Sequence, residues 1–379
     1  MASKVPQTIR CKAAICWGPE EPLTVEEIEV EPPRSSEVRI RILCASLCHT
    51  DQSCWKGYLG PLYPRVLGHE GVGVIESVGE GVDGLDEGDL VMPSFVGECG
   101  DCRNCSSNKT NLCFRYPVAL DGLMPDATAR MSVEGKKLYH LFSCSTFAEY
   151  TVVNVNYVVR VDPRLEPSHI SLLSCGFTTG FGAAWKEAGV DRGSSVAVFG
   201  LGGVGIGAVA AAKLLGASKI IGVDLNDKRK EKAEFYGMTD FINPKKNDGK
   251  TTVEIIREMT EGVGVDYSIE CTGAAAVTSE AFESTVMGRG VTVLLGVTPE
   301  QHASVDRTAL LYGRTVKGAL YGGVKLRSDL LSIIGKCISK EIKLDELITH
   351  RVGLDDINRA FELMKDADCL KVVIEISDM

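Results

Sequence analysis

The sequence lacks a long apolar segment, a block of like charges, an internal repeat and a low-complexity stretch. Its most apolar stretches, such as IGAVAAAKLLGA, are too short and too interrupted to span a bilayer, and no apolar h-region is visible near the amino terminus. The formal net charge of −10 disfavours a nucleic-acid partner, because a phosphate backbone is bound by basic surfaces. We therefore expect a cytoplasmic protein that binds neither nucleic acid nor a membrane.

With 379 residues, the chain is long enough for two or three domains with full cores. Hydrophobic residues make up 44% and charged residues 24%, as in soluble globular proteins. Its fourteen cysteines, in a chain without a visible export signal, are expected to be metal ligands and core residues rather than disulfides. Seven lie mostly in apolar runs and are expected to pack as small hydrophobic residues: Cys11, Cys16, Cys44, Cys54, Cys271, Cys337 and Cys369.

One cysteine quartet has the spacing C-x2-C-x2-C-x7-C and consists of Cys99, Cys102, Cys105 and Cys113. Four thiolates can close a tetrahedral shell around one Zn²⁺, which is the arrangement of structural zinc sites. The main rival is an iron–sulfur cluster, whose common bacterial run is C-x2-C-x2-C-x3-C followed by proline. Here the last gap has seven residues and Phe114 follows, so zinc is favoured.

A second set of candidate ligands is dispersed along the chain: Cys48, His69 and Cys175. Three protein ligands leave a fourth position for a reacting molecule, as in catalytic zinc sites. Asp51 follows Cys48 by three residues and could accept the other ring N–H of His69. Glu70 adds a carboxylate beside the histidine. A lone histidine is often an ordinary core residue, but these neighbours favour a ligand.

The first half of the chain is expected to be rich in β-strands, because short apolar runs alternate with proline and glycine. Residues 37–43, EVRIRIL, alternate as a half-buried strand does. The polar stretch from 108 to 137 is expected to be a loop inserted between strands. Residues 147–161 are expected to return to strand, and residues 169–189 to form a helix.

From Ser194 onward, apolar strands alternate with helical segments, which predicts a doubly wound parallel sheet. The first turn fits the dinucleotide fingerprint G-x-G-x-x-G, with a strand before it and a helix after it. Its glycines allow a tight turn, an approach of the backbone to a pyrophosphate, and close packing of the helix on the strand. The fingerprint consists of Gly200, Leu201, Gly202, Gly203, Val204 and Gly205.

Asp224 ends the next strand and could accept hydrogen bonds from the adenosine ribose of a dinucleotide. Its carboxylate would repel a 2′-phosphate, which favours NAD over NADP. Lys228 and Arg229 lie beyond it and could favour the phosphate instead, so NADP stays an alternative.

Together these pieces resemble the zinc-dependent, medium-chain alcohol dehydrogenases, from about residue 38 to the carboxyl terminus. SLCHTD and the long loop after Cys113 are most similar to the plant branch of that family. The resemblance implies a GroES-like, β-rich catalytic domain over 1–176 that carries both zinc sites. It further implies a Rossmann NAD-binding domain over 177–320, a return to the catalytic domain over 321–379, and a homodimer formed through the coenzyme sheets. The other matching segments are LGHEGVGVIESVGEGV, CGDCRNC, STFAEYTVV, SCGFTTGFGAAW, VFGLGGVG, IIGVD and ITH.

The resemblance also implies roles for single residues. Zn²⁺ would stabilise an alkoxide as a Lewis acid, Thr50 would carry the alcohol proton away, and hydride would pass to NAD. Glu70 and Asp51 would lie beside this metal. The implied coenzyme contacts are His49 and Lys371 at the pyrophosphate, Asp224 and Arg229 at the ribose, and Thr179, Thr272 and Val297 along the pocket. The implied substrate pocket consists of Leu59, Phe95, Phe142, Cys144 and Leu320.

Four positions depart from the family pattern. Ser53 stands where many relatives have a histidine that ends the proton relay, so the proton would leave to water or to His49. Lys371 replaces an arginine, which keeps the charge but loses the bidentate fork. Ser143 and Cys144 replace a Gly-Thr pair beside the substrate pocket, which indicates an unusual substrate.

Alternative functions stay open at this point. GLMPD in the inserted segment, with Arg115 as a partner for a carboxylate, resembles S-hydroxymethylglutathione (formaldehyde) dehydrogenases, but QSCWKGYLG lacks the acidic residues of that branch. A non-catalytic dinucleotide-binding protein is a second alternative. Because Thr50 and Glu70 are present, we expect interconversion of an alcohol with an aldehyde or ketone, on a substrate such as a plant specialised metabolite.

Overall fold

The computed structural model describes residues 6–300 and 302–377. The chain forms two compact units, one made of Met1–Cys175 with Lys325–Met379 and the other of Gly176–Val324. The chain thus leaves the first unit directly after Cys175 and returns to it at Lys325.

The first unit contains a closed barrel of short strands in the order β1-β2-β7-β8-β4. Burial alternates in β7 and in the first half of β1, as in strands that present one face to a core, whereas the last four residues of β1 are all buried. The barrel strands are β1 (Ile9–Cys16), β2 (Thr24–Val30), β4 (Arg65–Val66), β7 (Met131–Val133) and β8 (Lys136–His140).

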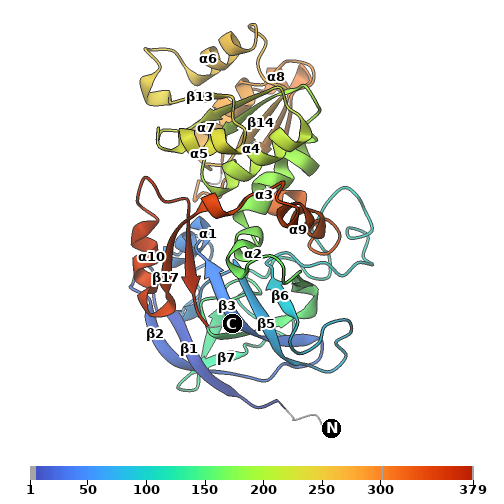
Figure 1. Cartoon of the computed structure of the whole chain (residues 1–379), viewed down its shortest axis with the longest axis vertical. Coiled ribbons are helices and arrows are strands. Elements are labelled where there is room, and N and C mark those ends of the chain that lie inside the picture. Colours follow the sequence, from blue (N-terminus) through green and yellow to red (C-terminus); the bar gives the residue numbers. More distant parts are fainter. Residues whose placement is uncertain (1–5, 301, 378–379) are drawn as a thin grey trace. The chain divides into compact units, whose positions relative to one another are not determined.

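A second sheet of the first unit has the order β10-β6-β5-β3-β18-β17, with β9 also paired to β3. Its carboxyl-terminal strands, red in Figure 1, join the blue strand β3, with Val373 opposite Ser46. The strands are β3 (Glu37–Ser46), β5 (Gly71–Val78), β6 (Leu90–Pro93), β9 (Tyr150–Asn154), β10 (Val158–Arg160), β17 (Ile348–Gly353) and β18 (Lys371–Glu375). The helices of this unit are α1 (His49–Trp55), α2 (Pro167–Leu173), α9 (Leu330–Ile338) and α10 (Ile357–Leu363).

The stretch expected to be one loop over 108–137 contains strand β7 and the start of β8, so that prediction was wrong at its end. Glu134 and Gly135 join the two strands with φ angles of 48° and 75°. Two consecutive positive φ angles match the twist of a tight hairpin. Met131 and Val133 are buried on one side of this hairpin. The two residues after Gly135, Lys136 and Lys137, are exposed, and their polarity made this part of the sequence resemble a loop.

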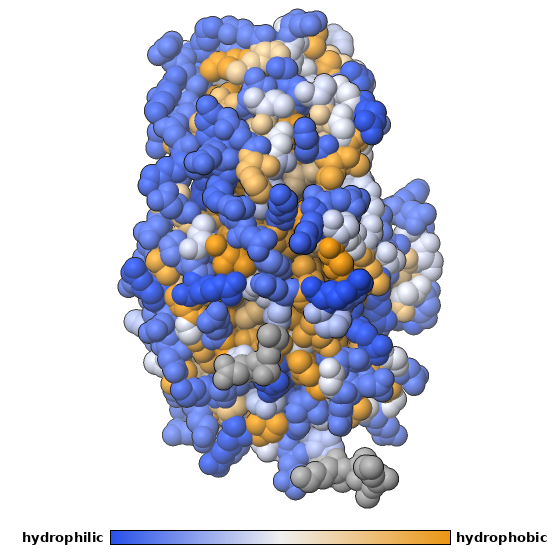
Figure 2. Space-filling view, in the orientation of Figure 1, coloured by the Kyte–Doolittle hydropathy of each residue, from blue (hydrophilic) through white to orange (hydrophobic). Residues whose placement is uncertain are grey.

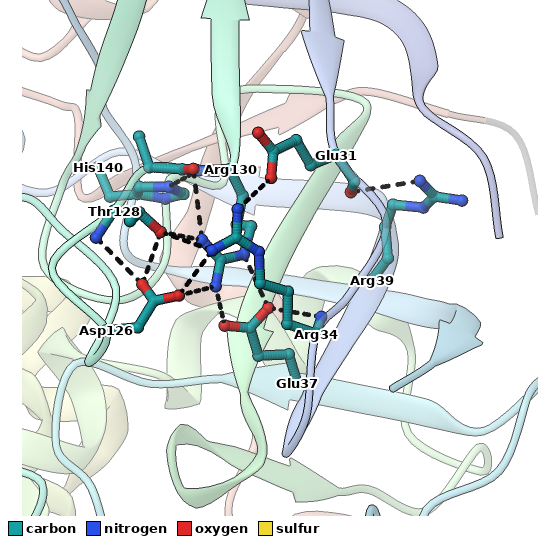
Figure 3. A network of polar contacts seen from close by, with 9 residues as sticks. Glu31, Arg34, Glu37, Arg39, Asp126, Thr128, Arg130 and His140 are labelled. Carbon is teal, nitrogen blue, oxygen red and sulfur yellow. Dashed lines mark hydrogen bonds and ion pairs between the residues drawn. The ribbon is translucent and has the colours of Figure 1, made fainter. Parts of the chain in front are cut away.

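A buried arginine anchors the rest of this inserted segment (Figure 3). Arg130 donates from Nε and Nη2 to the Glu37 carboxylate at 2.9 and 2.6 Å, and from Nη2 to Asp126 at 2.7 Å. Although partial burial opposes it, the hydrogen bond from Arg130 lowers the pKa of Asp126 well below its usual range. Breaking such a buried pair would leave an uncompensated charge, so the contacts hold the segment to the start of β3.

The second unit is a parallel sheet in the order β13-β12-β11-β14-β15-β16. Counted from its first strand this order is 3-2-1-4-5-6, the doubly wound arrangement that the alternating sequence predicted. Helices α6 and α7 pack against one face of the sheet, around Phe199, Ile221 and Ile256. The strands are β11 (Ser195–Phe199), β12 (Lys219–Val223), β13 (Asp240–Ile242), β14 (Tyr267–Glu270), β15 (Val291–Leu294) and β16 (Thr315–Gly318). The helices are α3 (Gly176–Gly182), α4 (Gly203–Leu215), α5 (Arg229–Tyr236), α6 (Thr252–Met259), α7 (Ala275–Glu283) and α8 (Arg307–Leu311).

Two segments expected to be continuous are interrupted. The helix expected over 169–189 is split into α2, α3 and a π-helical turn over Ala183–Ala188. The break falls at Ser174, whose backbone and side chain both bond back to the Ser171 carbonyl, and it leaves Cys175 at the junction. The strand expected over 147–161 is divided by a 3-10 turn that the Asn154 side chain caps.

No helix in the described ranges is long and apolar enough to cross a membrane. Hydrophilic residues cover most of the face shown in Figure 2, with smaller hydrophobic areas between them.

Candidate metal centres and coenzyme site

The four cysteines of the quartet converge as a metal site requires. The sulfur atoms of Cys99 and Cys105 lie 3.8 Å apart, and those of Cys102 and Cys113 lie 3.9 Å apart. A tetrahedron with Zn–S bonds of about 2.3 Å has edges of about 3.8 Å, so the spacing fits a Zn(Cys)₄ shell. Backbone N–H groups of Cys102 and Cys105 each donate to the preceding cysteine sulfur at 3.4 Å, which favours thiolates.

The quartet loop is fixed to the segment where the chain re-enters the first unit. Lys325 donates from Nζ to the carbonyls of Cys105 and Ser107 at 2.7 and 2.6 Å. Glu98, just before the quartet, accepts the backbone N–H of Arg327 at 2.6 Å. A folded quartet loop therefore holds residues 325–327 in place.

The dispersed ligand set also converges, on three junctions between elements. Cys48 is the N-cap residue of α1, His69 lies between β4 and β5, and Cys175 lies between α2 and α3. One ligand atom from each of these residues and one from Glu70 lie within 4.8 Å of one another. Donors from three distant segments thus meet at one point of the first unit.

Asp51 orients His69. Its Oδ1 lies 2.9 Å from His69 Nδ1 and accepts the Gly68 N–H at 3.1 Å, while Oδ2 accepts the Cys48 N–H at 3.0 Å. The imidazole proton is therefore assigned to Nδ1, and Nε2 keeps its lone pair. In the described part of the chain, buried Nε2 has no hydrogen-bond partner. A buried polar atom is normally paired, so this one fits a metal ion.

The two candidate thiol ligands differ in how readily they lose a proton. The hydrogen bond between Cys48 and Cys175 lowers the pKa of Cys48 well below its ordinary value and raises the pKa of Cys175. The two sulfurs thus share one proton. Thiolates are the form that binds zinc, and a divalent cation would displace the remaining proton.

Glu70 is fully buried behind this ligand set. Its Oε2 accepts short hydrogen bonds from Lys371 Nζ and from Ser46 Oγ. Burial raises the pKa of Glu70, and Lys371 opposes that rise. Burial alone would lower the pKa of Lys371, but the Glu70 carboxylate raises it above its ordinary value. The amine of Lys371 therefore lies on Glu70, and its contact with a coenzyme pyrophosphate stays a prediction.

Two aromatic rings flank the candidate metal ligand His69. Phe95 and Phe142 each lie with ring centroids 5.7 Å from the imidazole, in edge-on geometry, and 5.7 Å from each other. Phe142 has a φ of 52°, which is costly for a bulky residue and shows that its surroundings fix its position.

Two other residues expected at the substrate pocket differ in burial. Leu59 is half-buried, and Leu320, in the second unit, is 44% exposed.

Cys144 was expected to line the substrate pocket or to pack in the core, and its place at a pocket stays a prediction. Its side chain is fully buried, with 0% exposure. Burial raises the pKa of its thiol far above the ordinary value, so the thiol is protonated.

Arg115, the expected partner for a glutathione carboxylate, instead pairs with Asp101 at 2.6 Å.

Helix α1 carries the residues expected to move the proton. Thr50 follows Cys48 by two residues and is half-buried, while His49 is exposed. Ser53 lies one turn further along α1 and is half-buried. A side chain at 53 therefore shares a helix face with residues 49 and 50.

The second unit offers a phosphate-binding turn at the amino end of α4. A Cβ on Gly205 would lie 1.9 Å from the Gly200 carbonyl, so only glycine allows this approach of helix to strand. A Cβ on Gly202 would meet nothing within 4 Å, which leaves open space at the helix N-cap. Asp224 accepts the Leu201 N–H at 2.7 Å and lies beside this turn. The turn and carboxylate fit a dinucleotide.

The loop after β14 completes this edge of the sheet. Buried Glu270 accepts the Thr272 N–H at 2.6 Å and the Gly273 N–H at 2.9 Å. A Cβ on Gly200 would lie 2.8 Å from the Thr272 methyl, so the two turns touch at the switch point of the sheet. The other expected coenzyme residues vary in burial: Thr179 is 8% exposed, Val297 49% exposed, and Arg229, at the start of α5, half-buried.

Sequence reasoning missed Ser46 and the contact of Lys371 with Glu70. Ser46 carries a weak signal, since it is a small polar residue at the end of an apolar strand, two residues before Cys48. No signal links Lys371 to Glu70, because 301 residues separate them.

Comparisons with known proteins agree with this geometry. Residues 34–163 match the family described as the alcohol dehydrogenase GroES-like domain, and residues 203–336 match the zinc-binding dehydrogenase family. The "CYP enzymes assisting alcohol dehydrogenase" of Catharanthus roseus is 56% identical over 98% of this chain and 100% of its own length. "Alcohol dehydrogenase 1" of Artemisia annua is 52% identical over 99% of this chain and 100% of its own.

A solved structure of benzyl alcohol dehydrogenase from Acinetobacter calcoaceticus has a TM-score of 0.89 and 28% identity, covering 97% of this chain and 100% of that one. The barrel-containing unit is thus GroES-like, and the parallel sheet is a Rossmann domain. Family matches, full-length relatives and converging thiolate and imidazole ligands lead to one conclusion. The chain belongs to the zinc-dependent, medium-chain alcohol dehydrogenases, enzymes that interconvert alcohols with aldehydes or ketones.

Proposed function

We propose that the enzyme uses NAD(H) and carries two zinc ions per subunit, one catalytic and one structural. The observation that carries the proposal is the meeting of Cys48, His69 and Cys175 around an imidazole nitrogen without a partner in the described chain. Three ligands fit a catalytic zinc with an open position, and the quartet fits a closed structural site. The domains divide accordingly, with metals in the first unit and coenzyme in Gly176–Val324.

The catalytic ion, when bound, supplies Lewis-acid stabilisation of an alkoxide, and the nicotinamide accepts hydride. Residues of the protein orient the ligand and move the proton. Asp51 holds His69 in the required tautomer. Thr50 accepts the hydrogen bond of the alcohol and passes its proton toward solvent, with His49 on the same helix as a second acceptor.

We propose NAD rather than NADP because Asp224 places a carboxylate beside the phosphate-binding turn. That carboxylate suits a ribose diol and repels a 2′-phosphate. Arg229, Thr179, Thr272 and Val297 are proposed as further coenzyme contacts.

We propose an apolar or aromatic alcohol of plant specialised metabolism as the substrate class. Support comes from the phenyl rings of Phe95 and Phe142 beside His69. One relative's name says that it assists CYP enzymes, and a similar structure belongs to a benzyl alcohol dehydrogenase.

We further propose a homodimer in a reducing compartment such as the cytoplasm. The fourteen cysteines all lie in the described ranges and none of them forms a disulfide there, which fits a reducing environment. Strand β16 ends the described parallel sheet, and Leu311 and Tyr312 nearby in sequence are 78% and 61% exposed. Sedimentation at several concentrations tests the dimer.

Elemental analysis combined with a panel of alcohols at fixed NAD tests the central proposal. We expect two zinc ions per chain and turnover of benzylic or terpenoid-like primary alcohols. Turnover only of S-hydroxymethylglutathione, turnover of no alcohol, or a single zinc per chain would contradict it.

A further inference from the structure

Ser46 lies directly behind the catalytic ligand set and touches its carboxylate. It is the last residue of β3 and is fully buried. Its backbone N–H donates to the Glu70 carbonyl at 2.8 Å, and its hydroxyl donates to Glu70 Oε2. The Ser171 carbonyl lies 3.3 Å from the same hydroxyl. A serine carries one hydroxyl proton, and the shorter contact is with Glu70.

Lys371 approaches the same carboxylate oxygen from another strand. Its Nζ donates to Glu70 Oε2 and lies 3.3 Å from the Leu47 carbonyl. One oxygen of Glu70 is therefore held by two donors from β3 and β18, neighbours in one sheet. The serine is the stiffer of the two, because a lysine reaches Glu70 through a flexible four-carbon stem.

The position of Glu70 matters because it lies among metal ligands. One of its oxygens lies within 4.8 Å of the ligand atoms of Cys48, His69 and Cys175. A carboxylate so close to a three-ligand site can occupy the fourth position, which an alcohol oxygen needs. The groups that hold Glu70 away from the metal therefore set the fraction of enzyme molecules that can bind the alcohol.

We propose that Ser46 is a positioning residue: its hydroxyl, together with Lys371, holds the Glu70 carboxylate by Oε2 and keeps it from the fourth metal position. The inference rests on the proposed zinc site. Without the hydroxyl, Oε2 loses the stiffer of the two donors described above, and the Glu70 carboxylate gains access to the metal. The bound carboxylate then competes with the alcohol within the same molecule.

Ser46→Ala tests this, with Ser171→Ala as the matched control. Ser171 is equally buried, and its hydroxyl donates to the Ser168 carbonyl at 2.8 Å rather than to Glu70. In the zinc-loaded Ser46→Ala enzyme we expect the KM for the alcohol to rise about tenfold with kcat nearly unchanged, because only the competent fraction falls. Zinc at the catalytic site should also leave more slowly to a chelator, since a fourth protein ligand holds it. Ser171→Ala should change neither quantity.

Glu70→Gln provides the decisive second comparison. If Ser46 acts through the Glu70 carboxylate, Ser46→Ala in the Glu70→Gln background should change neither KM nor zinc release. An equal effect in both backgrounds, or wild-type KM and zinc release in Ser46→Ala, would overturn the inference. Zinc content and alcohol turnover of the unmodified enzyme are measured first. Their absence contradicts the proposed function, whereas their presence with an unchanged Ser46→Ala variant contradicts the role of Ser46 alone.

Discussion

Asp51 holds the His69 imidazole from the side opposite to the candidate metal position, with Oδ1 2.9 Å from Nδ1 and both side chains buried. The carboxylate fixes the tautomer and makes Nε2 a stronger donor to a cation. Asp51→Asn should therefore weaken zinc binding at the catalytic site about 10–100-fold, without loss of the quartet metal. Competition with a zinc chelator measures this. Asp162→Asn is the control, because half-buried Asp162 pairs with Arg164 and with no candidate ligand. Equal zinc affinity in wild type and Asp51→Asn would refute the role of Asp51.

Cys102→Ala should remove the quartet metal and lower the melting temperature by roughly 10 °C, because a structural metal contributes free energy of folding. Elemental analysis should show one zinc per chain instead of two. Cys337→Ala removes a buried cysteine that is no candidate ligand and should keep both ions. A normal zinc content in Cys102→Ala would exclude the quartet as the site.

Lys325→Met should loosen the segment that the quartet loop holds. The change removes the bonds from Nζ to the carbonyls of Cys105 and Ser107. We expect faster hydrogen exchange in residues 99–113 and 325–328, because exchange reports local opening. Lys336→Met, which removes an exposed pair with Glu341, should leave those segments unchanged. Wild-type exchange in both segments would show that other contacts suffice.

Asp224→Gly should weaken the preference for NAD. Loss of the carboxylate removes a hydrogen-bond acceptor for the ribose and the repulsion of a 2′-phosphate. We expect the KM for NAD to rise about tenfold and turnover with NADP to improve. Steady-state kinetics with both coenzymes measure this, and Asp248→Asn, at an exposed residue, is the control. An unmodified enzyme that used NADP as well as NAD would contradict the charge argument.

Ser53→His should speed proton removal near pH 7. An imidazole with an ordinary pKa near 6.5 is largely unprotonated there and can accept the proton that leaves through Thr50. The gain should shrink at high pH, where hydroxide accepts the proton. Single-turnover rates are the measure, because coenzyme release can limit the steady state. Gln52→His, which places an imidazole on the preceding residue, is the control. A single-turnover rate of Ser53→His equal to that of the wild type throughout pH 6 to 9 would refute the relay.

The sequence by itself determined the features that depend on neighbouring residues. The quartet lies in one loop, so its spacing alone predicted a zinc-like cluster. The parallel sheet followed from alternating apolar strands and helices, and the Gly-rich turn from the demands of one strand-to-helix connection. The hairpin over 131–140 was missed because its exposed lysines resemble a loop, although its buried residues alternate.

Only the tertiary structure decided which distant residues meet. Cys48, His69 and Cys175 come from three separate junctions, and Cys175 is available because the expected helix breaks beside it. Lys371 pairs with Glu70 across 301 residues, and Ser46 joins them through the pairing of β3 with β18. Backbone propensities act over a few residues, whereas such contacts depend on how whole strands pack. That is why the ligand types could be predicted from the sequence and the support behind them could not.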